Sequence, residues 1–313
     1  MAIRDDGPAL TVMIPLGGLG SRFAKDGYTM RTKPFVRVLG KEMLLWLTDQ
    51  LNLRKDDVLV IVYNPAFSNI KVCMETILRP KLWDRVRFVE LAGATRGAAE
   101  TVLLGVEGLE PELQQRPIML CDGDTFYTAD IVSKYRSVAA KGRNGVFCFH
   151  DTQKKPIYSY IKIDDMSPDG KSGNRLITEV KEKVKISDYA NSGCYSFQNG
   201  KILKTYCKKI IDKALTQQSQ DGVGEFYTSG VISAMIEDNY DFEAILLQRA
   251  DMQVLGTPAQ VEQFCAEWPD QPALRFVFDL DNTLCTTPRR KGDYTTCEPV
   301  SHTIAYLKQV KVC

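Results

Sequence analysis

The chain has 313 residues, 44% of them hydrophobic, so it is long enough to bury one large core or two smaller ones. Its 40 basic and 39 acidic residues leave a formal charge of +1, which excludes the strong field that many nucleic-acid and membrane-surface proteins use. Nine cysteines without a C-x-x-C pair and only two histidines argue against a disulfide framework and against a zinc site. Without a membrane-length apolar run or an apolar signal core, we expect a cytoplasmic protein with no membrane or nucleic-acid partner.

Short apolar runs alternate with segments of helical period from Leu10 to Cys121. Strands are predicted for LTVMIPL, DVLVIVY, VRFVEL and PIMLC, and helices for KEMLLWLTDQL, SNIKVCMETIL and GAAETVLLGVEGL. This βαβα order predicts an α/β fold, doubly wound around a largely parallel sheet with helices on both faces.

After His150 the pattern changes to shorter, alternating segments. YSYIKID, RLITEVKEKV and NSGCYSF predict antiparallel strands, with the turn-rich MSPDGKSGN between the first two. We therefore expect a small antiparallel addition that forms a lid or substrate-side subdomain. A helix in EFYTSGVISAMIED, strands in DFEAILL and MQVLG, and a helix from Pro258 to about Trp268 follow. The prolines of WPDQPA predict a linker, so we assign one domain to residues 8–268, a linker to 269–273 and a further segment to 274–313.

Three glycines, Gly17, Gly18 and Gly20, follow the first predicted strand directly. They lie at the carboxyl end of a strand, where α/β sheets bind ligands, and without Cβ atoms their backbone amides can approach phosphate oxygens. Arg22 and Lys33 would add two cations for phosphate. The spacing matches neither a P-loop nor a dinucleotide-binding fingerprint. The residues themselves therefore indicate a nucleoside triphosphate held by a different kind of loop.

PLGGLGSRF followed by KP resembles the signature loop of the sugar-phosphate nucleotidyltransferases, which make nucleotide sugars from a nucleoside triphosphate and a sugar 1-phosphate. TRGAAETVLLG, PIMLCDGDTFY, EKV, NSGCYSF, GEFYTSGVIS and VLGTPAQV resemble later segments of that family in the same order. The likeness covers about Leu10 to Glu267. It implies a Rossmann-like mixed sheet and a magnesium-dependent enzyme.

The resemblance also implies a role for each residue that matches a family motif. The nucleotide-binding residues would be Leu16, Gly17, Gly18, Gly20, Ser21, Gly97 and Ala98. The catalytic residues would be Arg22 and Lys33 on the triphosphate, Asp124 on Mg²⁺ and Lys183 on the acceptor phosphate. The acceptor contacts would be Asp122, Gly123, Glu182, Asn191 and Gly193, with Glu179 and Ser192 beside them. Asp122 lies two residues before Asp124 at a strand end and is the candidate second Mg²⁺ ligand.

Two positions depart from the family pattern. Val254 stands where the family often has a second metal-binding acid, and Asp251 is near it but out of register. Val184 replaces the proline that usually follows the lysine. A non-catalytic sensor of nucleotide sugars therefore stays open beside the enzyme.

These motifs together predict transfer of a nucleoside monophosphate to a sugar 1-phosphate with release of pyrophosphate. That reaction depends on positioning and charge neutralisation and needs no covalent nucleophile. A cytidylyltransferase acting on phosphocholine or a similar alcohol phosphate is the alternative, because Tyr158, Tyr160 and Tyr195 could surround an ammonium group. The sequence fixes neither the base nor the acceptor, and a homo-oligomer stays open.

A second motif lies in LRFVFDLDNTLC, residues 274–285. It resembles motif one of the haloacid dehalogenase superfamily, D-x-D-x-T, with Asp279 in the place of the nucleophile and Asp281 in that of the proton shuttle. The residues after Thr283 are too few for the sheet that carries the superfamily's later motifs, although SHTIAYLKQVKV predicts one helix. We therefore expect an incomplete, vestigial phosphatase-like fragment, with a phosphatase reaction through Asp279 as a remote alternative.

Overall fold

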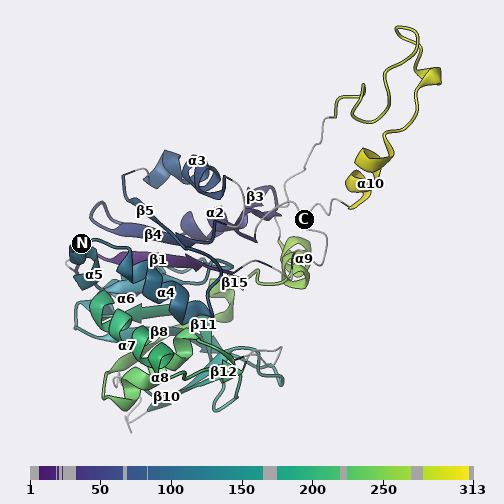
Figure 1. Ribbon diagram of the computed structural model, residues 1–313. Coiled ribbons are helices and arrows are strands. Elements are labelled where there is room, and N and C mark those ends of the chain that lie inside the picture. The colour runs from purple at the N-terminus through teal and green to yellow at the C-terminus, as the bar shows by residue number, and fades with distance from the viewer. Residues whose placement is uncertain are drawn as a thin grey trace, which may run out of the picture.

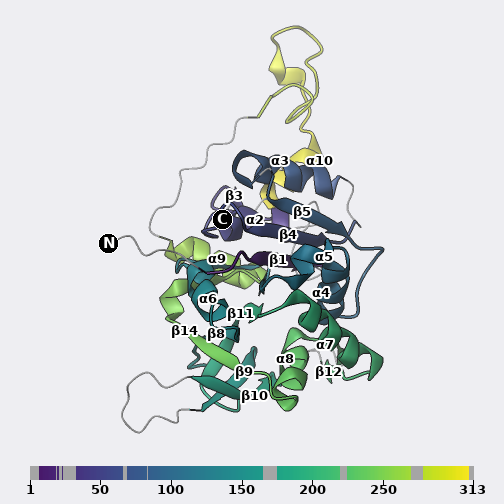
Figure 2. The same ribbon diagram turned by 90° about the vertical axis from the view of Figure 1, so that its left-hand side faces the viewer.

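The computed structural model describes residues 7–18, 20, 23, 33–65, 69–82, 84–164, 175–218, 224–268 and 278–309. Both views show a large body of sheet and helices; residues 278–309 lie apart from it in Figure 1, whereas α10 overlaps α3 in the view of Figure 2. The strands, in chain order, are β1 (Thr11–Leu16), β2 (Arg37–Val38), β3 (Lys41–Glu42), β4 (Val58–Tyr63), β5 (Val86–Glu90), β6 (Ile118–Cys121), β7 (Thr125–Tyr127), β8 (Asn144–His150), β9 (Ser159–Asp164), β10 (Leu176–Glu182), β11 (Tyr189–Phe197), β12 (Gln217–Gln218), β13 (Gly224–Glu225), β14 (Phe242–Leu247) and β15 (Met252–Val254). The helices are α2 (Met43–Thr48), α3 (Ile70–Leu82), α4 (Ala98–Glu107), α5 (Pro111–Gln115), α6 (Ile131–Ala139), α7 (Gly200–Asp212), α8 (Thr228–Glu237), α9 (Pro258–Glu267) and α10 (Ser301–Gln309), with the 3-10 turns η1 (Lys33–Phe35), η2 (Arg249–Asp251) and η3 (Tyr294–Thr296).

The main sheet is mixed, and its strand order within the described residues is β5-β4-β1-β6-β11-β8-β14-β10-β9. β1 pairs in parallel with β4 and β6, and β4 pairs in parallel with β5, which confirms the predicted parallel half. β11 runs antiparallel to β6 and β8, and β9 pairs with both β10 and β11. The predicted antiparallel strands are therefore confirmed, but they continue the main sheet and do not form a separate lid.

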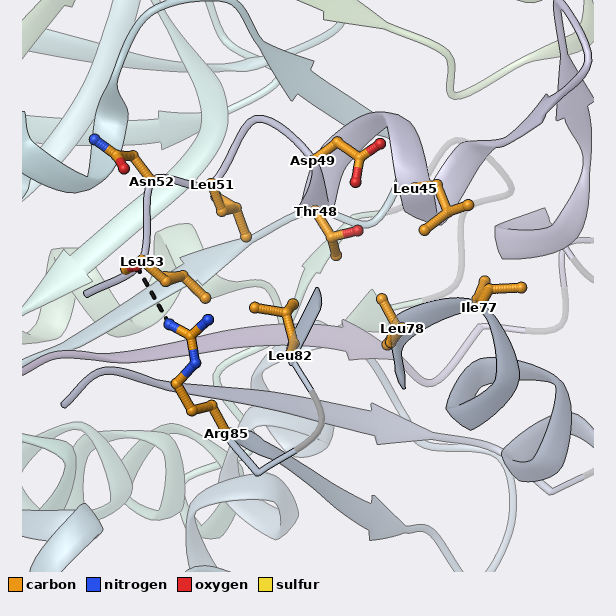
Figure 3. A pocket seen from close by; sticks show the side chains of 10 residues that line it. All are labelled: Leu45, Thr48, Asp49, Leu51, Asn52, Leu53, Ile77, Leu78, Leu82 and Arg85. Carbon is orange, nitrogen blue, oxygen red and sulfur yellow. Dashed lines mark hydrogen bonds between the residues drawn. The ribbon is translucent and has the colours of Figure 1, made fainter. Parts of the chain in front are cut away.

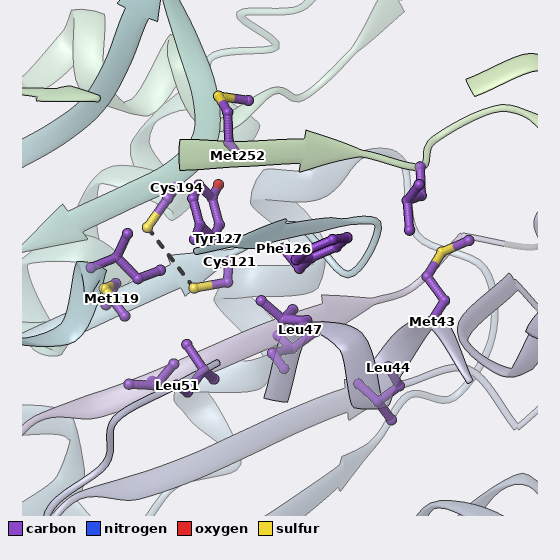
Figure 4. Close-up of a cluster of buried hydrophobic side chains, with 14 of the residues drawn as sticks. Met43, Leu44, Leu47, Leu51, Met119, Cys121, Phe126, Tyr127, Cys194 and Met252 are labelled. Carbon is purple, nitrogen blue, oxygen red and sulfur yellow. Dashed lines mark hydrogen bonds between the residues drawn. The ribbon is translucent and has the colours of Figure 1, made fainter. Parts of the chain in front are cut away.

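Helices cover both faces of the sheet and enclose two hydrophobic cores. Val12 and Ile14 of β1 face the core under α2, α3, α6 and α9, whereas Met13 faces the core under α4, α7 and α8. In the first core, Leu47 of α2 and Phe126 of β7 are among the buried side chains (Figure 4). All six residues of β4 are buried, as expected for an inner strand covered on both faces. The doubly wound architecture is thus confirmed.

Several elements differ from the prediction in extent. The helix predicted over residues 41–51 is only α2, because Lys41–Glu42 pairs with Arg37–Val38 as a short hairpin. The helix predicted from residue 225 begins at Thr228, because Gly224–Glu225 pairs with Gln217–Gln218.

Besides the short strands β2, β3, β12 and β13, the elements α5, β7, α6, β8 and α7 were not predicted. The two longer helices among them, α6 and α7, carry a sequence signal at their first turn. Asp130 Oδ1 accepts a hydrogen bond from Ser133 N at 2.9 Å at the start of α6, and Asn199 Oδ1 accepts one from Ile202 N at 3.2 Å at the start of α7. An Asp or Asn before a segment of helical period is therefore the signal that could have located them.

The strand order brings the predicted site motifs to one edge of the sheet. β1 and β6 run in parallel, so their carboxyl ends, Leu16 and Cys121, lie at the same edge. β11 runs antiparallel to β6 with Cys194 opposite Cys121, so Asn191–Gly193 lie at that edge too. The glycine loop, the Asp122–Asp124 turn and the start of β11 are therefore neighbours.

The C-terminal segment contains the predicted helix, α10, and two isolated bridges that join Asp281 to Cys285 and Cys285 to Pro299. Residues 278–280 are not in a strand, and the rest of the strand predicted before Asp279 lies outside the described residues, as does the predicted linker 269–273. The domain boundaries stay predictions. Among the described residues, no helix has both the length and the apolar character that crossing a bilayer requires.

A pocket of about 200 Å³ opens between α2 and α3 (Figure 3). Aliphatic side chains of both helices line it, and Arg85 at its rim donates hydrogen bonds to the backbone oxygens of Leu53 and Arg54 at 3.3 and 2.8 Å. None of the lining residues belongs to the predicted site. We assign no substrate to this pocket.

Candidate functional site

The glycine loop leaves β1 through residues that have different structural reasons to be glycine. A Cβ on Gly17 would lie 2.4 Å from Thr101 Oγ1 of α4, whereas a Cβ on Gly18 would meet no atom of the described residues within 4 Å. Gly20 has a φ of +68° and packs against Lys33, whose Cβ would lie 3.3 Å from an added methyl group. Gly17 therefore allows close packing on α4, Gly20 allows a left-handed turn, and the space beside Gly18 is open to a ligand. Ser21 and Arg22 lie outside the described residues.

Lys33 and Asp124, which are far apart in the sequence, form an ion pair between Lys33 Nζ and Asp124 Oδ2. Each side chain keeps 24% of its surface exposed. Leu255 N donates to the backbone oxygen of Asp124 at 2.7 Å and fixes the turn from the side of β15. We call the glycine loop, Lys33, Asp122 and Asp124 the donor cluster, because the prediction placed all of them on the nucleoside triphosphate or its metal.

Asp122 has an unusual environment within this cluster. Burial, followed by the charge of Asp124, raises the pKa of its carboxyl group to about 8; Glu182 also raises this pKa, and Lys33 opposes the shift. Asp122 as a whole residue is partly exposed. Its carboxylate nevertheless packs closely on Gly193, where an added Cβ would lie only 2.6 Å from Asp122 Oδ2. Gly193 has a φ of +86°, so it is glycine for its backbone conformation and for the space that Asp122 fills.

The donor set at the Asp122–Asp124 turn fits Mg²⁺. Two carboxylates provide hard oxygen ligands, and their mutual repulsion, visible in the raised pKa of Asp122, would be relieved by a divalent cation bound to both. In the described part of the chain no group of three or more potential metal ligands gathers, so phosphate oxygens and water would complete the coordination. Val254 lies in β15 opposite Thr125, and Asp251 Oδ2 accepts from Gln248 N at 2.9 Å to cap η2. Neither residue supplies the second acid.

The predicted base-recognition turn lies at the amino end of α4, where Ala98 is the first helical residue and Gly97 precedes it with a φ of +143°. A Cβ on Gly97 would lie 2.5 Å from the backbone oxygen of Phe226. Phe226 N donates to Arg96 O at 3.1 Å, and Ala99 N donates to Phe226 O at 2.9 Å. The turn is therefore held by the backbone of residue 226, a contact that the sequence did not reveal.

The acceptor cluster, Glu182, Lys183, Tyr227 and Ser229, joins the end of β10 to the start of α8. Lys183 Nζ donates to Tyr227 Oη at 3.0 Å, and Ser229 Oγ donates to Glu182 Oε2 at 2.8 Å. Burial raises the pKa of Glu182, and the bond from Ser229 and the charge of Lys183 oppose that rise. Glu182 in turn helps to raise the pKa of Asp122, so the donor and acceptor clusters influence each other electrostatically.

Asn191 is buried beside these clusters, with 3% of its surface exposed. Its Oδ1 accepts from Gly193 N at 2.9 Å, which fixes the orientation of the amide, and its Nδ2 is buried with no hydrogen-bond partner among the described residues. A buried donor without a partner is unfavourable, so this amide nitrogen is suited to a ligand oxygen.

The family model described as nucleotidyl transferase matches residues 12–242, which include both clusters. The chain belongs to the nucleotidyl transferase family. The match ends before residue 274, so the likeness of residues 274–285 to a dehalogenase motif stays a prediction.

Solved structures share the fold of this nucleotidyl transferase. A nucleoside-diphosphate-sugar pyrophosphorylase from Vibrio cholerae RC9 superposes with a TM-score of 0.67 at 21% identity, over 82% of this chain and 100% of that one. A UDP-glucose pyrophosphorylase complexed with UDP-glucose gives 0.63 at 13% identity, over 82% and 96%. An inositol-1-phosphate CTP transferase from T. maritima gives 0.55 at 14% identity, over 81% and 91%. A search of curated protein sequences finds no match.

Some predicted site residues of the transferase also make contacts within the protein. A Cβ on Gly123 would lie 2.4 Å from Leu16 Cδ2, so Gly123 allows these two predicted site residues to pack together. Glu179 forms an ion pair with Lys181 on the face of β10 opposite Glu182, and its role as a sugar contact stays a prediction. Asp279 and Asp281 are exposed, and they belong to the segment 278–309, which lies apart from the main sheet in Figure 1.

Phe226, Tyr227 and Ser229 received no functional role from the sequence. The three residues are consecutive or nearly so in GEFYTS, which carried the family resemblance only as a motif. Their roles rest on contacts with Gly97, Lys183 and Glu182 across the fold. No local signal besides the glycine at position 97 could have located them.

Proposed function

We propose that the protein catalyses the magnesium-dependent transfer of a nucleoside monophosphate from a nucleoside triphosphate to a sugar 1-phosphate. An oxygen of the acceptor phosphate attacks the α-phosphorus, the bond between the α-phosphorus and the bridging oxygen breaks, and pyrophosphate leaves. The observation that carries the proposal is the meeting of a glycine loop, Lys33 and two carboxylates at the edge of the sheet, with Glu182 close enough to raise the pKa of Asp122.

On the donor side, the chain supplies positioning and positive charge. Backbone amides of the glycine loop can approach the triphosphate because Gly18 leaves open space. Lys33 is held near the reacting phosphate by Asp124 and would exchange this carboxylate for the α-phosphate. Mg²⁺, when bound by Asp124 and Asp122, neutralises charge on the triphosphate.

On the acceptor side, the polar groups favour a polyhydroxy compound. Asn191 Nδ2 has no partner within the described protein, and a hydroxyl oxygen of a sugar would satisfy it. Glu182 could accept a hydrogen bond from a second hydroxyl, and Lys183 would bind the phosphate. Phosphocholine has no hydroxyl groups for these residues, and Tyr160 is fully buried with its hydroxyl on Asp151 Oδ2 at 2.6 Å, where it cannot line a choline cage.

An alcohol phosphate with a CTP donor is the second candidate. The fold neighbour named as an inositol-1-phosphate CTP transferase supports it, and inositol also offers hydroxyl groups. We further infer a cytoplasmic location. This location suits the reduced state of the described cysteines. Cys121 and Cys194 are an example, because their Sγ atoms lie 3.9 Å apart and form no disulfide bond.

The test is pyrophosphate release in the presence of Mg²⁺. ATP, CTP, GTP, UTP and dTTP are each combined with a panel of sugar 1-phosphates, inositol 1-phosphate and phosphocholine. Asp124→Asn is compared with wild type, and Asp84→Asn, at an exposed position between α3 and β5, serves as the matched control.

Release with one donor and one acceptor, lost in Asp124→Asn and kept in Asp84→Asn, is the expected result. Sugar phosphates as acceptors support the first candidate, and inositol 1-phosphate or phosphocholine with CTP supports the second. Silence across the panel in folded protein would refute both and favour the sensor. Phosphate release that depends on Asp279 would instead reveal a phosphatase.

A further inference from the structure

The segment Gly224–Ser229 contacts the base-recognition turn through Phe226 and supplies two members of the acceptor cluster, Tyr227 and Ser229. It runs from β13 into the first turn of α8. We call it the linking segment. Within six residues it reaches groups from α4 and from the end of β10 that are remote from each other in the sequence.

The donor end of the linking segment is fixed by backbone contacts. Phe226 forms one hydrogen bond to Arg96 O at 3.1 Å and accepts one from Ala99 N at 2.9 Å. The Arg96 guanidinium lies 5.3 Å from the centre of the Phe226 ring. Because residue 97 is a glycine, the backbone of residue 226 can pack against the turn at a distance that leaves no room for a side chain at position 97.

At the acceptor end, Tyr227 holds the side chain of Lys183. A lysine side chain has four rotatable bonds, so fixing its ammonium in one place is entropically unfavourable unless a partner holds it. Tyr227 Oη accepts from Lys183 Nζ at 3.0 Å. The backbone of Lys183 has a φ of +54°, which is unfavourable for a residue with a side chain, and a bond from its N–H to Tyr158 O at 2.9 Å stabilises it.

Ser229 holds the neighbouring carboxylate in the same way. Its side chain is buried, and its hydroxyl donates to Glu182 Oε2 at 2.8 Å. Gln217 Oε1 lies 2.9 Å from the same Oγ and competes for the single hydroxyl proton. The orientation of Glu182 therefore depends on a hydroxyl group at position 229.

We propose that Tyr227 and Ser229 are positioning residues for the acceptor, acting through Lys183 and Glu182, and that Phe226 anchors them to the donor side. The inference rests on the proposed function, since it assigns the acceptor phosphate to Lys183 and an acceptor hydroxyl to Glu182. Its consequence is specific: the phenol and the hydroxyl govern how well the acceptor binds, and leave binding of the nucleoside triphosphate unaffected.

The first experiment measures KM for each substrate in Tyr227→Phe, Ser229→Ala and Ser229→Thr. We expect the acceptor KM to rise about tenfold in the first two, with the nucleotide KM within about twofold of wild type. Ser229→Thr keeps the hydroxyl and should restore the acceptor KM. Tyr206→Phe is the matched control, because it removes a phenol that donates to Asp238 Oδ2 at 2.6 Å between α7 and α8.

Equal rises in both KM values, or an unchanged acceptor KM, would overturn the inference. A role confined to stability would lower the folded fraction, and with it the apparent kcat, without changing either KM. If wild-type protein releases no pyrophosphate with any pair of substrates, the proposed function fails, and a second measurement decides the positioning role.

That measurement is hydrogen exchange followed by mass spectrometry. Tyr227→Phe should speed exchange in residues 181–186 severalfold and leave residues 201–212 as in wild type, because it releases Lys183 only. Tyr206→Phe should leave residues 181–186 unchanged. If residues 181–186 exchange at the same rate in Tyr227→Phe as in wild type, Tyr227 does not hold Lys183, whatever the activity of the protein.

Discussion

Replacing Gly97 with alanine tests how the base-recognition turn is held. The new Cβ would lie 2.5, 2.7 and 3.0 Å from the O, N and C atoms of Phe226, whereas ordinary van der Waals contact begins at 3.4 Å. These are backbone atoms, so they cannot rotate away as a side chain would. The backbone segments at residues 97 and 226 would have to separate by about 0.9 Å, the difference between 3.4 and 2.5 Å.

The expected loss of stability follows from two contributions. Separation would break the hydrogen bonds from Ala99 N to Phe226 O and from Phe226 N to Arg96 O, each contributing about 1 kcal/mol. With a φ of 143° and a ψ of 176°, position 97 lies in a region that is essentially restricted to glycine, which adds about 1–3 kcal/mol. A total of about 4 kcal/mol corresponds to a fall in Tm of roughly 10 °C.

Gly142→Ala is the matched control, because Gly142 also has a positive φ, +68°, but has no atom within 4 Å of its added Cβ. Its strain alone should cost about 1 kcal/mol and a few degrees. Thermal unfolding of the two variants and wild type in the same buffer gives the comparison. A fall in Tm for Gly97→Ala no larger than that for Gly142→Ala would refute the packing of the turn on Phe226.

Three further predictions concern charge and thiols. Arg136→Met should lower the free energy of unfolding by about 3–5 kcal/mol in urea, because it leaves the buried carboxylate of Asp57 without the guanidinium that binds it at 2.6 and 3.1 Å; a loss below about 1 kcal/mol would contradict this. In metal-free protein the raised pKa of Asp122, about 8, means that its favourable contribution is complete below the unfolded pKa near 4 and is lost as pH rises toward 8, by at most about 1.4 kcal/mol per pH unit. Asp122→Asn should flatten that slope in chemical denaturation at a series of pH values, and an unchanged slope would exclude Asp122 as its source. An aromatic disulfide reagent should label exposed Cys73 quickly and buried Cys121, Cys148, Cys194 and Cys207 only after denaturation, because burial raises the pKa of Cys148, Cys194 and Cys207; early labelling of Cys194 would contradict the packing of β6 on β11.

The parallel half of the fold could be predicted because its signals are local. β1 and β4 are short, largely apolar runs. In each case the apolar run ends sharply at turn-forming residues, so the strand can be located from the local sequence. The antiparallel half of the sheet was harder to predict. The alternation of apolar and polar residues in β9, β10 and β11 fits a separate sheet as well as an extension of the first. Only the pairings of β11 with β6 and β8 decide between these arrangements, and those pairings join residues far apart in the sequence.

The candidate site divides in the same manner. Lys33 and Asp124 were assigned from family motifs, and their direct ion pair shows why the two motifs belong together. Phe226 was missed because it acts through its backbone, which any residue except proline could supply. Glu179 stays a predicted sugar contact, but the alternation of side chains along β10 puts it on the face opposite Glu182, where it pairs with Lys181.

The two lysines of the site differ in what holds them, and this difference bears on how the two substrates would be bound. Lys33 is paired with a carboxylate, so on binding a phosphate it exchanges one anion for another and gains little net attraction. Lys183 is held by a phenol, which orients the ammonium without neutralising it. An acceptor phosphate therefore adds an anion where Tyr227 supplied only a neutral oxygen, so the gain in electrostatic attraction is larger on the acceptor side. Positioning of Lys183 matters for the same reason, since its ammonium, which also lies within electrostatic range of Glu182, attracts the acceptor phosphate productively only when it is fixed in direction.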